Sequence, residues 1–177
     1  MKIVVACLTL FLLAGMGFSQ EKDLETLKAW ALKNAQTTSN ATLSGDYRTV
    51  LQYTLPSVLE MMGGMESAVA LLEETFAGMK EQGFAFEKAE VVNVSDIVFE
   101  QEEYRCYVEC FNQMKFNGMR IKSKSYLLGI YNQENDLWYF LEAKQLKNLV
   151  LANEVLPDFE TNLVIPDDVM ETEEIKE

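Results

Sequence analysis

Hydrophobic positions near the start of the chain recur at three- and four-residue steps, the period of an amphipathic helix. Residues 21–38 carry such a stripe, made of Leu24, Leu27, Ala31 and Ala35. Trp30 and Leu32 flank it. The pattern predicts a helix over residues 21–38, followed by a polar turn.

Two more helices are predicted before Gly83. Asp46 is a candidate N-cap of a short helix that ends near Pro56, and the glycine pair at 63–64 then interrupts the pattern. A longer helix is predicted over residues 65–82, where Gly83 suits a left-handed C-terminal cap. Its expected core stripe is Val69, Leu72, Phe76 and Met79.

Beyond Gly83 the hydrophobic period changes from 3.6 to 2, which is typical of strands. The predicted strands surround Val91 and cover residues 97–99, 104–116, 119–131 and 137–141. Helices followed by an antiparallel sheet indicate an α+β fold. We therefore predict one α+β domain over residues 20–165 and an acidic, disordered tail over residues 166–177.

The pair Asn117-Gly118 predicts a two-residue hairpin turn, because a type I′ turn needs positive φ at both positions. Cross-strand partners then run from Phe116 with Met119 to Cys106 with Gly129. Charged side chains all fall on one face of this hairpin, so the face with the cysteines should point inward.

The inward face is apolar at its ends but polar in the middle, where Asn112, Ser123 and Ser125 lie beside Cys110. These groups could satisfy one another, water or nearby backbone. Alternatively they belong to an apolar cavity with a few convergent polar groups, the usual form of a small-molecule site. The candidate pocket comprises Tyr104, Cys106, Val108, Cys110, Asn112, Met114, Ser123, Ser125 and Leu127.

The outward face carries an apolar patch of Tyr107, Phe111, Tyr126, Leu128 and Ile130. Exposed apolar patches often mark association surfaces. A different explanation is that the later segment 144–166 lies over the patch.

Cys106 and Cys110 share a face of the predicted strand. Four strand residues separate their α-carbons by roughly 13 Å, and a disulfide needs less than about 7 Å. The chain contains no histidine, which removes the commonest general base and zinc ligand. We expect both cysteines to act as small core hydrophobes, and we expect no metal site and no cofactor.

The N-terminus has the features of a secretory signal peptide. Lys2 precedes an apolar run over residues 3–13, and small Gly17 and Ser19 suit cleavage after residue 19. The run is shorter than the roughly 20 residues that a spanning helix needs. We expect export to the periplasm or outside the cell, with no membrane span after signal removal.

The formal net charge is −13. Such a charge repels polyanions, so nucleic acid is not an expected partner. An acidic composition otherwise favours solubility and does not identify a ligand.

Two strings resemble a known superfamily. The stretch "GDYRTVLQYTLPSVLEMMGGMESAVALLEETF" and the later "NDLWYFLEA" resemble nuclear transport factor 2-like domains. The resemblance implies a cone, in which a strongly curved sheet wraps around helices and encloses a pocket. It also implies a homodimer formed through the outer face of the sheet. The superfamily includes both enzymes and catalytically inactive domains. No catalytic residue of its enzymes can be assigned to a position of this chain.

Two classes of function follow. In the first, an exported non-catalytic domain binds a small apolar or amphipathic ligand, or a protein partner, through the cone. In the second, a pocket enzyme of isomerase, dehydratase or hydrolase type uses an Asp or Glu with a Tyr. The inward face of the hairpin offers no carboxylate, so only helix residues such as Asp46, Glu60 or Glu66 could supply one. Because acid and base groups are not paired, binding is favoured over catalysis.

Overall fold

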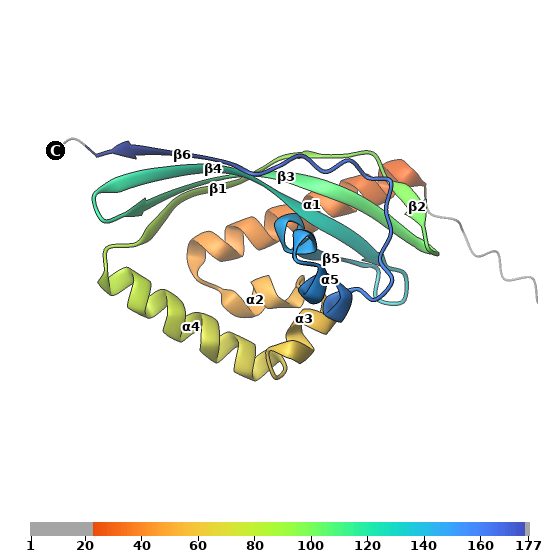
Figure 1. Ribbon diagram of the computed structural model, residues 1–177, viewed down its shortest axis with the longest axis horizontal. Helices are drawn as coiled ribbons and strands as arrows, with labels where there is room; N and C mark the ends of the chain where they lie inside the picture. The colour runs from red at the N-terminus through yellow and green to blue at the C-terminus, as the bar shows by residue number, and fades with distance from the viewer. Residues whose placement is uncertain (1–22, 176–177) are drawn as a thin grey trace, which may run out of the picture.

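The computed structural model describes residues 23–175 (Figure 1). Its helices are α1 (Leu24–Ser44), α2 (Tyr47–Gln52), α3 (Pro56–Met61), α4 (Met65–Glu81), the 3-10 helix η1 (Ala143–Lys147) and α5 (Leu149–Val155). Its strands are β1 (Ala85–Val94), β2 (Val98–Glu100), β3 (Glu103–Phe116), β4 (Met119–Asn132), β5 (Leu137–Glu142) and β6 (Val169–Glu174). The predicted signal peptide lies outside the described residues.

Helix α1 buries the predicted stripe at Leu27, Ala31 and Ala35. It runs past the expected turn to Ser44, because Ala41 adds another buried contact and Gly45 provides the left-handed end at φ 73°. The polar turn predicted after residue 38 is therefore wrong.

The short helix α2 has the predicted cap. Asp46 Oδ1 accepts a hydrogen bond from the Thr49 amide at 3.1 Å, which satisfies one of the free N–H groups of the first turn. Pro56 does not end this helix. It begins α3 instead, since proline fits the first helical turn, where no N–H donor is needed.

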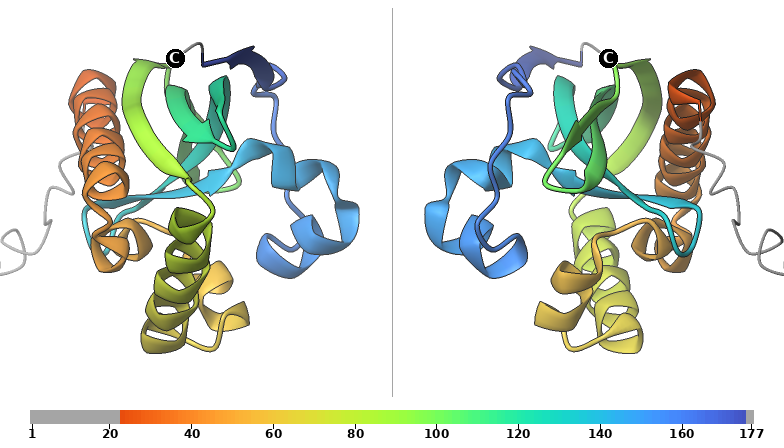
Figure 2. Two further views of the ribbon diagram at one scale, coloured as in Figure 1. Left: turned by 90° about the vertical axis from the view of Figure 1, so that its left-hand side faces the viewer. Right: turned by 90° about the vertical axis from the view of Figure 1, so that its right-hand side faces the viewer.

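Helix α4 has the predicted bounds, and Gly83 after it has φ 83°. The predicted stripe is only half-buried, and Ala68 is the one buried residue of this helix. Figures 1 and 2 show the reason: α4 lies apart from the sheet, across the space beneath its concave side.

The six strands form one antiparallel sheet in the order β1-β3-β4-β5, with β2 added beside β3 and β6 beside β4. The α+β class is thus confirmed. So is the hairpin register, which runs from Phe116 with Met119 to Tyr104 with Tyr131. The turn residues Asn117 and Gly118 have φ of 49° and 75°.

The core lies between α1 and the inner face of the sheet. Cys106, Val108 and Trp138 are fully buried there against the α1 stripe. The Trp138 Nε1–H donates to the Leu27 carbonyl at 3.0 Å, so the indole both fills the core and fastens α1 to β5.

The outer apolar patch is covered by the chain itself. Tyr126, Leu128 and Ile130 are 6%, 0% and 5% exposed, and Tyr107 and Phe111 are half-buried. Residues 143–165 cover Leu128 and Ile130 through Leu146, Leu151, Val155, Leu156, Phe159, Leu163 and Ile165. In Figure 2 the segment η1–α5 lies on the side of the sheet away from α1. The segment considered as an alternative cover therefore lies over Leu128 and Ile130, while Tyr107 and Phe111 stay half-buried. Association of two copies through the outer face stays a prediction.

The expected disordered tail is wrong for Val169–Glu174. These residues form β6, which pairs with Met119–Lys124 along an edge of β4 that β5 leaves free. Glu173 reaches Lys122 at 3.1 Å and Arg120 at 3.5 Å. All six residues are exposed, so β6 is held by backbone hydrogen bonds and surface ion pairs and not by a core.

Among residues 23–175, no helix has the length and apolar character needed to cross a membrane.

Candidate ligand cavity

A cavity of about 830 Å³ lies between the inner face of the sheet and the helices. Its wall takes residues from α1, α2, α3, α4, β1, β3, β4, β5, η1 and β6. The volume falls in the range of about 300–1,000 Å³ that is typical of small-molecule pockets. The cavity exists because α4 stands away from the sheet and the side chains beneath the sheet do not fill the gap.

Most of the pocket residues proposed from the sequence line this cavity. They are Cys110, Asn112, Met114, Ser123, Ser125 and Leu127. The other three do not reach it. Cys106 and Val108 are sealed under α1 at 0% exposure, and the Tyr104 ring packs beside Phe99 and Tyr131. The inner face is therefore divided into a filled core at one end and a hollow at the other.

The polar cluster lies inside the hollow. Asn112 Nδ2 donates to Ser125 Oγ at 3.4 Å, a long and weak hydrogen bond. Ser123 lines the same wall, and its hydroxyl has no hydrogen-bonding partner among the described residues. The cluster therefore satisfies itself only in part.

Helix α1 adds polar groups that the sequence did not mark. Thr38 and Thr42 line the cavity, and their hydroxyls donate to the carbonyls of Asn34 and Thr38 at 3.1 and 3.0 Å. Since each hydroxyl proton is used by the helix, the oxygen lone pairs remain as acceptors. Thr42 fell in the predicted polar turn and Thr38 at the last position of the predicted helix, so their place together on a helix face was not foreseen.

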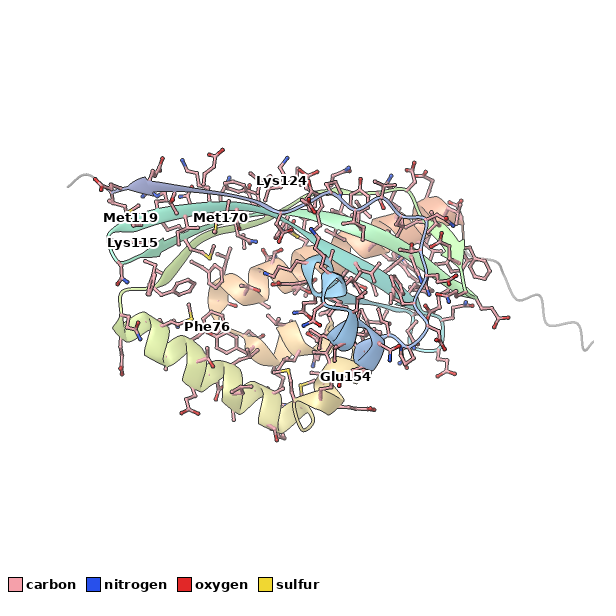
Figure 3. All side chains as sticks on the ribbon, in the orientation of Figure 1. Phe76, Lys115, Met119, Lys124, Glu154 and Met170 are labelled. Atoms are coloured by element: carbon pink, nitrogen blue, oxygen red, sulfur yellow. The ribbon has the colours of Figure 1, made fainter. Side chains whose placement is uncertain are left out.

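One end of the cavity is aromatic. Phe86 lines it, and the Phe76 ring approaches Phe86 with centroids 5.9 Å apart. Phe76 also stacks on Tyr47 at 5.0 Å. Figure 3 shows Phe76 pointing from α4 toward the sheet. These rings join α4 to β1 and close the cavity toward the hairpin end.

The cavity also contains a carboxylate that the hairpin analysis missed. Glu142 continues the inward alternation of Trp138 and Phe140 along β5 and pairs across the sheet with Leu127. Lys144 forms an ion pair with it at the edge of the cavity. The alternation of β5 was the signal that could have revealed Glu142.

Asp168 is a second carboxylate at the same edge. Its Oδ1 accepts a hydrogen bond from the Tyr126 amide at 3.2 Å, in the short gap between the ends of β5 and β6 on β4. The Asp168 carboxylate thus takes the place of a backbone carbonyl from a neighbouring strand, so its role is structural.

The helix carboxylates considered from the sequence do not line the cavity. The Asp46 carboxylate caps α2, and hydrogen bonds from Thr49 lower its pKa. Glu66 binds Arg48 at 2.6 Å, and this hydrogen bond lowers the Glu66 pKa. Glu60 is exposed on α3. None of the three is placed to act on a molecule in the cavity.

Both cysteines of the described chain are free and buried. Burial raises the pKa of each thiol to about 12. Their cross-strand partners are Gly129 and Ser125, as the register predicted. Neither thiol has a base to activate it, so neither is a nucleophile at neutral pH.

Within residues 23–175, no three His, Cys, Asp or Glu side chains come together in a way that could hold a metal ion. No family model, curated protein or solved structure matches the chain.

Proposed function

We propose that this protein binds a small apolar or amphipathic molecule in the cavity and does not transform it. The observation that carries the proposal is a polar cluster, Asn112, Ser123 and Ser125, whose hydrogen-bonding capacity is only partly used inside an otherwise apolar hollow. Polar groups in protein interiors normally have partners, so a ligand that supplies them gains both affinity and orientation.

Access to these polar atoms supports the proposal. Among the side-chain nitrogen and oxygen atoms that are sealed from solvent in the described chain, only Ser57 Oγ lacks a hydrogen-bond partner. Ser123 Oγ has no partner either, so it must be reachable from the cavity. A molecule that fills the cavity can therefore contact it.

The proposal includes the cone-shaped fold of nuclear transport factor 2-like domains. Support comes from helices that precede an open antiparallel sheet and from a cavity between the two. It also includes export, on the strength of Lys2 and the apolar run of residues 3–13. Expression of the full chain and mass spectrometry of the secreted product test export. A product that retains residues 1–19 would contradict it.

The binding experiment is a thermal-shift screen of apolar and amphipathic compounds with two matched variants. Asn112→Leu removes the amide from the cavity wall. Gln113→Leu makes the corresponding change on the opposite face of the same strand, where Gln113 Nε2 donates to Glu87. We expect compounds that raise the Tm of the wild type to do so equally in Gln113→Leu and less in Asn112→Leu. Equal shifts in both variants would exclude this cavity as the site.

A pocket enzyme is the second candidate, and Glu142 is the observation that favours it. This carboxylate lines the cavity together with Tyr53. Its ion pair with Lys144 and its 48% exposed side chain leave it poorly placed as a general base, which needs contact with the reacting proton. Compounds that bind should be recovered unchanged by mass spectrometry after long incubation. Conversion that stops in Glu142→Gln would establish the enzyme instead.

A further inference from the structure

The strand register divides the cavity wall into successive rows. Phe86 and Met114 pair in the first row, and Ala89, Asn112 and Ser123 form the second. Cys110 and Ser125 make the third row, and Leu127 begins the fourth. The wall is therefore apolar at Phe86 and Met114, then polar across two rows, then apolar at Leu127. Glu142 shares the row of Leu127 and is ion-paired with Lys144.

The polar rows offer both kinds of hydrogen-bonding group. Asn112 uses an N–H on Ser125, so its Oδ1 remains an acceptor. The oxygens of Thr38 and Thr42 are acceptors as well, since their protons are bonded within α1. Ser123 keeps its hydroxyl proton as a donor. A ligand group that both donates and accepts fits this band better than a pure acceptor.

The apolar rows on either side have a definite reach. Rows on one face of a strand are two residues apart, or about 6.6 Å. An extended chain of roughly five carbons covers that distance at about 1.5 Å per bond, with allowance for the bond angles. From a group centred between the two polar rows, each apolar row is one and a half spacings away, about 10 Å. A five-carbon arm then ends within van der Waals contact of Met114 and Phe86 on one side, and of Leu127 on the other.

Charge is confined to the edge of the cavity. The ionisable acidic and basic groups on its described wall are Glu142, Lys144 and Asp168. Lys144 is paired with Glu142, and Asp168 is bonded to the Tyr126 amide. No cation is left to hold a carboxylate or phosphate, and the net charge of −13 repels anions.

We propose that the ligand is an uncharged molecule with an internal donor–acceptor group, such as a secondary amide, between two apolar arms. The central group lies between the two polar rows, against Asn112, Ser123, Ser125 and α1, and the arms occupy the apolar rows. This ligand class rests on the proposed binding function and narrows it.

Two isomeric probes separate this arrangement from an ordinary polar head group. N-pentylpentanamide carries its amide between a four-carbon arm and a five-carbon arm, and decanamide carries the same atoms with the amide at one end. Decylamine and decanoate add a cationic and an anionic head. We expect isothermal titration to show N-pentylpentanamide binding about tenfold more tightly than decanamide, the effect of one well-matched hydrogen-bonding group. Decanoate should bind most weakly.

Two variants assign the difference to the polar rows. In Asn112→Leu the two isomers should bind with similar affinity, because the apolar rows remain and the central acceptor is gone. Ser123→Ala should reduce the preference for N-pentylpentanamide without abolishing binding. Because it removes only one oxygen, it also serves as the test if Asn112→Leu folds poorly. Gln113→Leu should keep the full preference.

The outcomes separate the two proposals. If none of the four probes binds, the proposed function fails together with this ligand class. If decanamide or decylamine binds more tightly than N-pentylpentanamide, the internal-group arrangement is overturned while binding in the cavity stands. Equal affinity of the two isomers in the wild type would also overturn it.

Discussion

Replacement of Arg105 by methionine should loosen the segment that covers the outer face of the sheet. Arg105 is 3% exposed, although it comes from a strand face that is charged in sequence. Its Nη1 donates to the Glu160 carbonyl at 2.7 Å, and its Nη2 donates to Gln101 at 2.9 Å and Glu103 at 2.8 Å. The guanidinium also lies 4.7 Å from the Phe159 ring centroid. One side chain thus ties the β2–β3 turn to residues 159–160.

The expected cost follows from these contacts. Removing one partner from a buried charged network costs about 3–5 kcal/mol. The Glu103 side chain is 42% exposed and can regain water, so we expect the lower end, about 3 kcal/mol. For a domain of this size that corresponds to a fall in Tm of roughly 6–12 °C.

Urea denaturation measures the loss, and hydrogen exchange locates it. Amides near Glu160 should exchange faster in Arg105→Met, while α1 amides keep their relative protection. Lys122→Met is the control, because Lys122 forms an exposed ion pair with Glu173 and should cost less than about 1 kcal/mol. The reasoning is wrong if Arg105→Met costs no more than Lys122→Met.

Three other changes have definite expected outcomes. Gly78→Ala should stabilise α4 by about 0.5–1 kcal/mol in urea denaturation, since the new Cβ meets no atom within 4 Å, and a lower midpoint would contradict this. Gly129→Ala should destabilise the fold by about 1–3 kcal/mol, because its Cβ would lie 3.0 Å from Cys106 Sγ, and an unchanged midpoint would refute the contact. With a pKa of about 12, the thiols of Cys106 and Cys110 are thiolate in roughly one molecule in 10⁴ at pH 8. The raised pKa favours the neutral thiol, so a disulfide reagent should react faster as pH rises or urea unfolds the chain, and fast labelling of both thiols in the folded protein at pH 8 would contradict the burial.

The candidate cavity was only partly visible in the sequence. The hairpin placed Asn112, Ser123 and Ser125 on an inward face, and they line the hollow. Alternation alone could not say that Val108, two residues away from Cys110, would be sealed under α1. That difference depends on where a helix crosses the sheet. Glu142 lies one residue beyond the predicted strand 137–141, so its inward position was not predicted.

The hairpin register and most local elements could be derived from the sequence alone, but the end of α1, helix α3 and strand β6 could not. Asn117-Gly118 requires a particular turn, and the alternating charges then set which side chains share a face, so both could be derived from neighbours along the chain.

What covers each face of the sheet, and where space is left, depends on how the elements pack in three dimensions. Residues 143–165 bury Leu128 and Ile130, β6 occupies a free edge of β4, and α4 stands away from the sheet. These outcomes depend on contacts between segments distant in sequence. There, the free energy gained by burying apolar surface is set against the entropy lost when the connecting chain closes into a loop. No pattern within a single element contains that information, which is why the hollow could be proposed from the sequence but its extent could not.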